Sequence, residues 1–181
     1  RDRYARNLPG VERLSISSTP YSAYSYLGGN RIESSLRRTD AEFWRILQFD
    51  FREGTPYTTD DVAQAQMVAV ISETTRSKFF GQSRAVGRDL EVDGQRFRVV
   101  GVVADVSRLR QVPYSDIWVP LTTAKTDSYK SEMLGNHFAI VLMREGASAV
   151  LAKEEFASRL RRAELPNPKL LKHLYAPLET M

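Results

Sequence analysis

Residues 79–105 read FFGQSRAVGRDLEVDGQRFRVVGVVAD, and this stretch decides how the chain is classified. Four glycines stand among basic residues, ahead of a run of valines. Three interpretations are open: a phosphate-binding loop, a turn that carries a nucleophilic serine, or a β-hairpin joined to a helix. The first two predict a nucleotide-binding protein or an enzyme, and the third predicts neither.

A phosphate-binding loop does not fit the spacing of the glycines. A Walker A loop has four residues between its glycines, followed by lysine and then serine or threonine. Here five residues separate Gly81 from Gly87, and Arg88 and Asp89 follow. The carboxylate of Asp89 would repel a phosphate, and the G-x-G-x-x-G pattern of dinucleotide sites is absent from the sequence. We therefore do not expect nucleotide binding in this stretch.

A small serine hydrolase is an alternative that depends on Ser83. The residues from Gly81 to Ala85 loosely resemble a G-x-S-x-G elbow, with alanine in place of the last glycine. In that elbow the serine follows a strand and precedes a helix, whereas Ser83 is predicted to follow a helix and precede a strand. The chain offers two histidines as a base, His137, which opens a predicted strand, and His173 near the end of the chain.

In the hairpin interpretation, a single strand register agrees with the turn type, the apolar face and the cross-strand charge pairs. Asp93-Gly94 is a strong two-residue turn, because both central positions of a type I′ turn have φ > 0. On a mainly apolar face this turn pairs Val92 with Gln95, Leu90 with Phe97, and Arg88 with Val99. On the other face it pairs Glu91 with Arg96 and Asp89 with Arg98, so opposite charges meet twice. We predict two antiparallel strands over residues 88–100.

The remaining glycines of the stretch are assigned to turns or close packing. Gly81 is predicted to end the preceding helix in a left-handed conformation. Gly101, inside the second strand, predicts a bulge or a close approach of another backbone. Gly87, Asp93 and Gly94 complete the set of residues with a structural role.

The composition is that of an ordinary folded domain. Of the 181 residues 42% are hydrophobic and 27% are charged, and the formal net charge is a mild +4. A basic nucleic-acid-binding domain stays as a further alternative, although no aromatic and basic RNA motif supports it. The sequence contains no cysteine, which excludes disulfides, thiolate zinc sites and cysteine nucleophiles. We expect no metal site and no cofactor in this domain.

Hydrophobic periodicity and breakers predict an α+β fold. Strands are predicted at 11–18, on both sides of a turn at Gly28-Gly29-Asn30, at 66–72, 115–121, 137–145 and 173–179. Helices are predicted at 2–7, at 41–49 behind a Thr39-Asp40 cap, at 73–80 capped by Ser72, and at 149–164, with a short one from Thr59. Residues 51–61 are expected to form a polar connection. We interpret residues 40–133 as an inserted subdomain, and residues 1–39 with 134–181 as a second subdomain built from both chain ends.

The order of motifs in the middle block resembles the extracytoplasmic core domain of MacB-type ABC transporter permeases, within the wider MacB/FtsX group. The resemblance runs from about Leu8 to the last helix. The matching motifs are Phe43-Trp44 followed by Arg52-Glu53-Gly54, the strand that ends in Ile71-Ser72, Phe79-Phe80-Gly81 before Val86-Gly87, the Val99-Val100-Gly101-Val102 run, and Trp118-Val119-Pro120-Leu121.

The resemblance implies a non-enzymatic domain between two transmembrane helices of one parent chain, on the outer face of the bacterial inner membrane. It implies a porter-like subdomain from the chain ends and an inserted sabre-like subdomain. ATP would bind to a separate subunit or domain, and the permease would act with a second copy. The outer partner would be a periplasmic adaptor or another envelope protein. Residues 1–7 would then continue the first membrane helix.

Tyr21, Tyr24 and Tyr26 are the candidate partner-binding residues. Tyrosines among serines supply contact area at a low entropic cost, which is typical of binding loops. The alternative is a strand with half-buried tyrosines. A basic cluster in the last helix, Arg159, Arg161 and Arg162, is expected to form a solvated face.

Overall fold

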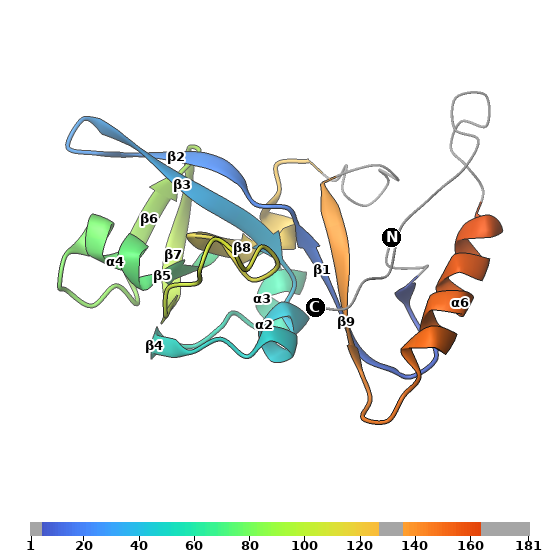
Figure 1. Cartoon of the computed structure of the whole chain (residues 1–181). Helices are drawn as coiled ribbons and strands as arrows, with labels where there is room; N and C mark the ends of the chain where they lie inside the picture. The colour runs from blue at the N-terminus through green and yellow to red at the C-terminus, as the bar shows by residue number, and fades with distance from the viewer. Residues whose placement is uncertain (1–4, 127–135, 164–181) are drawn as a thin grey trace.

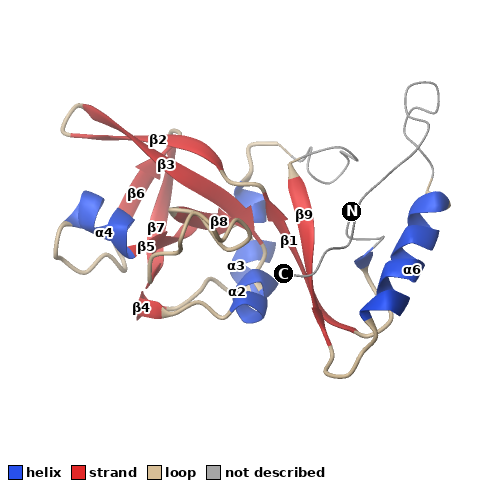
Figure 2. Cartoon of the chain, in the orientation of Figure 1, coloured by secondary structure: helices blue, strands red, loops and turns tan. Residues whose placement is uncertain are grey.

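The computed structural model describes residues 5–126 and 136–163, which form an α+β fold around a mixed sheet of nine strands (Figures 1 and 2). The sheet runs in the order β4-β7-β5-β8-β3-β1-β9, with β2 beside β3 and β6 beside β7. Its strands are β1 Val11–Ser18, β2 Tyr21–Leu27, β3 Asn30–Thr39, β4 Phe51–Gly54, β5 Val68–Ser72, β6 Asp89–Val92, β7 Gln95–Val103, β8 Ile117–Pro120 and β9 His137–Met143. The helices are α2 Glu42–Leu47, α3 Thr59–Ala63, α4 Glu73–Phe80, the 3-10 turn Leu121–Thr123 and α6 Ala149–Arg161. The predicted strand at 173–179 and most of the predicted helix at 2–7 lie outside the described residues.

The predicted hairpin over residues 88–100 is confirmed. Strand β6 pairs with β7 in the expected register, from Val92 opposite Gln95 to Asp89 opposite Arg98. The turn residues have positive φ, 51° at Asp93 and 68° at Gly94. The opposite charges face each other across the exposed side, although no ion pair joins them among the described residues.

Two apolar clusters lie on opposite faces of the sheet, because neighbouring strand residues point to opposite sides. One face carries the cluster that contains Ala69 and Ile71, and Phe79 and Phe80 pack against this cluster. Val70 lies on the other face in an aromatic cluster with Phe43, Trp44 and Trp118. Phe43, Trp44 and Trp118 are buried in the core, and Phe79 and Phe80 are partly buried. No helix in the described part of the chain is both long and apolar enough to cross a bilayer.

Strand β7 approaches other backbone closely at Gly101. A Cβ at this position would lie 2.6 Å from the Thr55 carbonyl oxygen and 2.7 Å from the ring of Phe51. The register between β5 and β7 also shifts here, from Ala69 opposite Val99 to Val70 opposite Gly101. Close packing and a bulge therefore occur together at this glycine.

Two local predictions are wrong. Residues 51–54, expected in a polar connection, form β4, which pairs antiparallel with β7. A strand of four residues with alternating partial burial is too short for its period to stand out in the sequence. Gly81 has φ 62° but ψ −133°, which is outside the left-handed helical region. This conformation is still one that glycine adopts far more readily than other residues.

Candidate functional site

Strands β1 and β9 form a two-stranded ribbon that meets the rest of the sheet at a narrow junction. The ribbon pairs along its length, from Val11 opposite Met143 to Ser18 opposite His137. Its ladder to β3 contains the single pair of Ser17 and Thr39. In Figure 1 the ribbon and α6 lie on one side of this junction, and β4 to β8 lie on the other. Side chains must therefore supply most of the connection.

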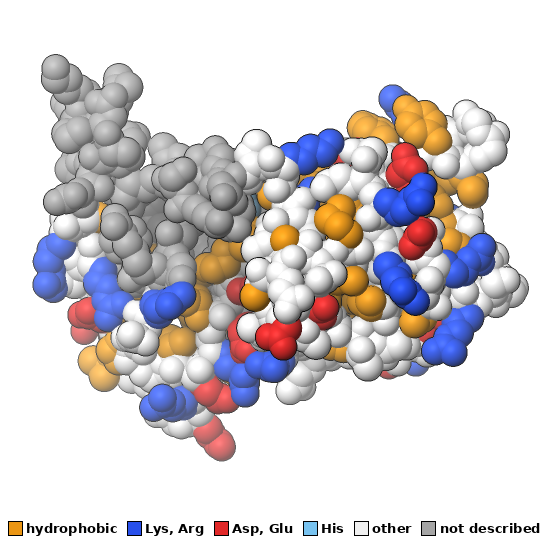
Figure 3. All heavy atoms as spheres, turned by 180° about the vertical axis from the view of Figure 1, so that it is seen from behind, with side chains coloured by type: hydrophobic (Ala, Val, Ile, Leu, Met, Phe, Trp, Pro, Cys, Tyr) orange, Lys and Arg blue, Asp and Glu red, His pale blue; other side chains and the backbone are white. Residues whose placement is uncertain are grey.

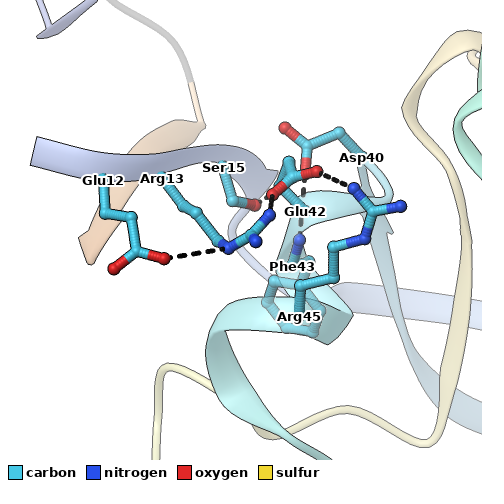
Figure 4. Close-up of polar contacts among 7 residues, drawn as sticks. All are labelled: Glu12, Arg13, Ser15, Asp40, Glu42, Phe43 and Arg45. Atoms are coloured by element: carbon cyan, nitrogen blue, oxygen red, sulfur yellow. Dashed lines mark hydrogen bonds and ion pairs between the residues drawn. The ribbon is translucent and has the colours of Figure 1, made fainter.

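Asp40, directly after β3, makes the central contacts of the junction (Figure 4). Its Oδ1 accepts hydrogen bonds from Ser15 Oγ at 2.7 Å and from the Phe43 backbone N–H at 3.1 Å. Its Oδ2 accepts from the Ile16 backbone N–H at 2.7 Å. One carboxylate thus connects β1 to the start of α2. Burial raises the pKa of Asp40, and the hydrogen bonds from Ile16, Ser15 and Phe43 oppose that rise.

The predicted Thr39-Asp40 cap of α2 needs a correction. The N-cap residue is Ala41, whose side chain makes no capping hydrogen bond. The Asp40 carboxylate reaches the Phe43 N–H from one residue further back. Asp40 is placed there because its other oxygen is held by β1, a contact between distant residues that the local sequence does not reveal.

A more exposed ion-pair network borders Asp40. Glu42 accepts from Arg13 on β1 at 3.0 Å and from Arg45 on α2 at 2.5 Å, and Glu12 lies 3.6 Å from Arg13. Exposed pairs of this kind contribute little to stability, about 0–1 kcal/mol each. Of these three pairs, only that between Arg13 and Glu42 connects β1 to α2.

Arg37 is a fully buried cation beside the same junction. Its Nη1 donates to Ser17 Oγ at 3.2 Å and to the Ser18 carbonyl at 3.1 Å, both on β1. On the other side, Nη2 donates to the Gln111 carbonyl at 2.8 Å, and Nε donates to the Tyr114 carbonyl at 3.2 Å. None of its hydrogen-bond partners among the described residues is a carboxylate, and burial lowers the pKa of Arg37 to about 10.

Two aromatic rings complete the surroundings of the Arg37 guanidinium. The rings of Phe43 on α2 and Phe138 on β9 lie 5.9 and 5.3 Å from its carbon, within the range of cation–π contact. Arg37 therefore contacts β1, β9, α2 and the loop before β8. The sequence analysis did not single it out, because an arginine after Leu36 in a half-buried strand is expected to point to solvent.

The three candidate tyrosines do not form one patch. Successive strand residues alternate between the faces of a sheet, so Tyr24 and Tyr26 share one face and Tyr21 lies on the other. Tyr26 is 74% exposed, whereas Tyr24 is half-buried with Arg31 4.7 Å from the centre of its ring. Tyr21 is exposed to a smaller extent, 38%.

The structure brings Tyr24 and the predicted turn residue Asp93 together. The Tyr24 N–H donates to Asp93 Oδ1, and the Asp93 N–H donates to the Tyr24 carbonyl, both at 2.8 Å. Lys125 Nζ also donates to the Asp93 carbonyl at 3.1 Å. The turn therefore covers the middle of the outer edge of β2, which blocks addition of a further strand there.

The structure does not assemble the parts of a hydrolase around Ser83. Ser83 is exposed, and it follows α4 and precedes β6, the reverse of the order in a nucleophile elbow. His137 opens β9, on the opposite side of the molecule from α4 (Figure 1), and His173 lies outside the described residues. Within 5–126 and 136–163, no three histidine or acidic side chains are grouped as metal ligands.

Comparison with known proteins places the chain in a family. A family model described as the MacB-like periplasmic core domain matches residues 1–159. The chain belongs to this family. The resemblance stated from the sequence is therefore confirmed, and the chain is the periplasmic core domain of an ABC-type permease of the inner membrane.

Relatives of the domain are much longer proteins. The macrolide export ATP-binding/permease protein MacB of Chromobacterium violaceum is 26% identical over 131 residues, which are 71% of this chain and 20% of that protein. MacB of Burkholderia cenocepacia is 35% identical over 106 residues, which are 58% of this chain and 15% of that protein. The pyoverdine export ATP-binding/permease protein PvdT of Pseudomonas aeruginosa is 29% identical over 115 residues, which are 59% of this chain and 16% of that protein. The match thus spans about a fifth or less of each relative.

Solved structures share the fold of the MacB-like domain. The extracellular domain of the ABC-type transporter YknZ, from Gram-positive bacteria, has a TM-score of 0.68 at 19% identity and covers 88% of this chain and 80% of its own. The periplasmic region of MacB from Actinobacillus actinomycetemcomitans has a TM-score of 0.67 at 17% identity, and the match covers 89% of this chain and 78% of that one.

Proposed function

We propose that this domain binds an envelope partner and relays ATP-driven movement of its parent permease to that partner. In this proposal ATP binds to a separate subunit or domain, and transmembrane helices of the same parent chain and a second permease copy carry the movement to the domain. A periplasmic adaptor is the kind of partner we expect. The names of the relatives, export ATP-binding/permease proteins, support efflux as the class of activity.

The narrow junction between β1 and β3 is the observation that carries the proposal. A single backbone pair resists bending less than a full ladder, because few hydrogen bonds must change. The described chain ends lie together on the ribbon side of the junction. Arg159 of α6 donates to the carbonyls of Arg6 and Asn7 at 2.5 and 3.1 Å, so it is not part of the solvated face expected from the sequence. Movement of the two ends would reach the ribbon first and the rest of the sheet through the junction.

The division into a porter-like part, 1–39 with 134–181, and a sabre-like part, 40–133, belongs to this proposal. The boundary at residue 40 falls directly after β3, whereas the junction lies between β1 and β3, both within residues 1–39. The two parts share one sheet, because β3 pairs in parallel with β8 from Leu36 opposite Ile117 onward. We therefore place the flexible point at β1–β3 rather than at β3–β8.

The β2–β3 hairpin is the proposed partner-binding arm. Figure 1 shows that it extends past the other strands, and Figure 3 shows apolar side chains at this end of the molecule. Tyr26 and Leu27, at 74% and 44% exposure, lie beside the Gly28-Gly29 turn at its tip. Tyr26 is therefore the strongest contact candidate of the three tyrosines, and Tyr24 supports the arm through Asp93.

A reversible cross-link tests the relay. Cysteines that replace Ser17 and Thr39 occupy directly opposite positions in an antiparallel pair, at a separation suited to a disulfide. We expect oxidation to slow ATP hydrolysis by the reconstituted parent permease several-fold and reduction to restore it, because a locked junction would oppose the movement that accompanies hydrolysis. Cysteines at Glu91 and Arg96, opposite each other within the β6–β7 hairpin, are the matched control. Full activity with the junction oxidised would refute the relay.

A further inference from the structure

The loop between β7 and β8 presents an apolar side chain between two cations. Leu109 is 93% exposed, and Arg108 and Arg110 on either side are exposed as well. A single exposed leucine is common on protein surfaces and is not in itself a sign of binding. The way in which the loop is held, and the charges around the leucine, carry the argument further.

Short-range hydrogen bonds fix the tip of this loop. The Arg110 N–H donates to the Ser107 carbonyl at 2.9 Å, and the Leu109 N–H donates to Ser107 Oγ at 3.3 Å. The Tyr114 N–H donates to the Arg110 carbonyl at 3.0 Å, and the Arg108 guanidinium lies 5.8 Å from the Tyr114 ring. The tip is thus preformed, which reduces the entropy lost when it binds.

Arg37 holds the base of the loop from inside the molecule. Its guanidinium donates to the carbonyls of Gln111 and Tyr114, the residues that follow the tip. A buried cation without a carboxylate is expensive, and well-packed apolar residues are often at least as stable in its place. Stability alone therefore does not account for Arg37, whereas a need to hold the loop in one position does.

Among the residues that the structure describes, no carboxylate forms an ion pair with Arg108 or Arg110. A complementary surface would carry acidic groups around a small apolar pocket for Leu109. Membrane binding through basic segments uses about four to eight cations, so this small tip suits a protein better than a lipid surface.

We propose that residues 107–111 form a second docking element, which inserts Leu109 into an apolar pocket on an acidic protein surface. The element is separate from the β2–β3 arm, and it rests on the proposed function only in that the domain binds envelope proteins. In Figure 1 the loop belongs to the part of the molecule with β4 to β8, away from α6.

Selection of short random peptides displayed on phage, with the 181-residue chain as bait, tests the proposal. We expect enriched peptides that combine aspartate or glutamate with an apolar residue. Their affinity, measured by fluorescence anisotropy, should fall at least about tenfold for Leu109→Asp and for the double variant Arg108→Glu with Arg110→Glu. Leu151→Asp, at another exposed leucine, and Arg84→Glu are the matched controls and should bind normally. Peptides that bind Leu109→Asp as well as the unchanged chain would overturn the proposal.

Two further measurements separate the alternatives. Binding of phosphatidylglycerol vesicles that depends on Leu109 would overturn the protein partner in favour of a lipid surface. Arg37→Met should speed amide exchange in residues 107–114 and weaken peptide binding. Unchanged amide exchange in a folded Arg37→Met variant would contradict the role of Arg37. If that variant does not fold, the peptide affinities of Leu109→Asp and Leu151→Asp are compared to test the docking element. The junction cross-link replaces Ser17, a partner of Arg37, whereas Leu109→Asp leaves Arg37 and the junction unchanged. Failure of the docking element, judged by Leu109→Asp, is therefore distinguishable from failure of the relay.

Discussion

Asp40 shows how one side chain can replace a missing stretch of sheet ladder. Three donors, from Ser15, Ile16 and Phe43, converge on its two oxygens where β1 and β3 part. Asp40→Asn keeps the shape but turns one acceptor into a donor that faces another donor. We expect a loss of about 1–3 kcal/mol in the free energy of unfolding, measured by chemical denaturation. Asp60→Asn on exposed α3 is the control, and an equal effect of both changes would contradict this role.

The same residue gives a pH dependence with a defined sign. Burial raises the pKa of Asp40 in the folded state above its ordinary 3.8, so the folded chain binds this proton more readily than the unfolded chain. The contribution of Asp40 to stability is therefore fully present below about pH 4 and falls as the pH rises through the folded pKa. The difference in unfolding free energy between the unchanged chain and Asp40→Asn should shrink over that window. A difference that grows with pH would show the opposite shift.

At the scale of elements, the turn of the β6–β7 hairpin is expected to stabilise the arm as well as the hairpin. Asp93→Ala removes the acceptor of the Tyr24 N–H and leaves alanine at φ 51°. We expect it to lower the free energy of unfolding by about 1–3 kcal/mol, and to speed amide exchange in β2. Asp93→Asn retains the oxygen and tolerates positive φ, so its effect should be clearly smaller. Equal losses for both variants would exclude the hydrogen bond as the cause.

Gly101 tests the packing between β7 and the segment at 51–55. An alanine Cβ would meet the Thr55 carbonyl and the Phe51 ring below 3.0 Å, and relief requires backbone movement. We expect Gly101→Ala to cost about 1–3 kcal/mol of stability in thermal or denaturant unfolding. At Gly81 no atom lies within 4 Å, so its alanine variant tests backbone strain alone. A neutral Gly101→Ala would mean that the strand relaxes freely there.

Elements with strong local signals were predictable, and those defined by distant contacts were not. The Asp93-Gly94 turn is sufficient to define the hairpin register, and Ser72 caps α4 as expected, with its side chain accepting from Thr75. Strand β4 escaped prediction because its four residues form a strand only beside β7. Arg37 escaped because its partners, from Ser17 to Tyr114, lie up to 77 positions away in the sequence.

At the scale of the whole molecule, the sheet is continuous but unevenly connected. Strands β8 and β3 join in a parallel ladder, whereas the β1–β9 ribbon is attached through one backbone pair, Asp40 and Arg37. The sequence predicted a subdomain boundary near residue 40, but it did not show that β1 and β3, both before that residue, share a single backbone pair. That arrangement depends on pairing between residues far apart, which periodicity does not report.

Distances across the junction test the central claim most directly. Spin labels at Ala139 on β9 and Arg96 on β7, both exposed, report on the two sides of the junction, and a pair at Lys78 and Arg96 reports on one side alone. The distances are measured by pulsed electron resonance in the parent permease, with and without an ATP analogue. We predict that the distance distribution between Ala139 and Arg96 changes while that between Lys78 and Arg96 does not. An unchanged Ala139 to Arg96 distribution in a permease that binds the analogue would contradict the account.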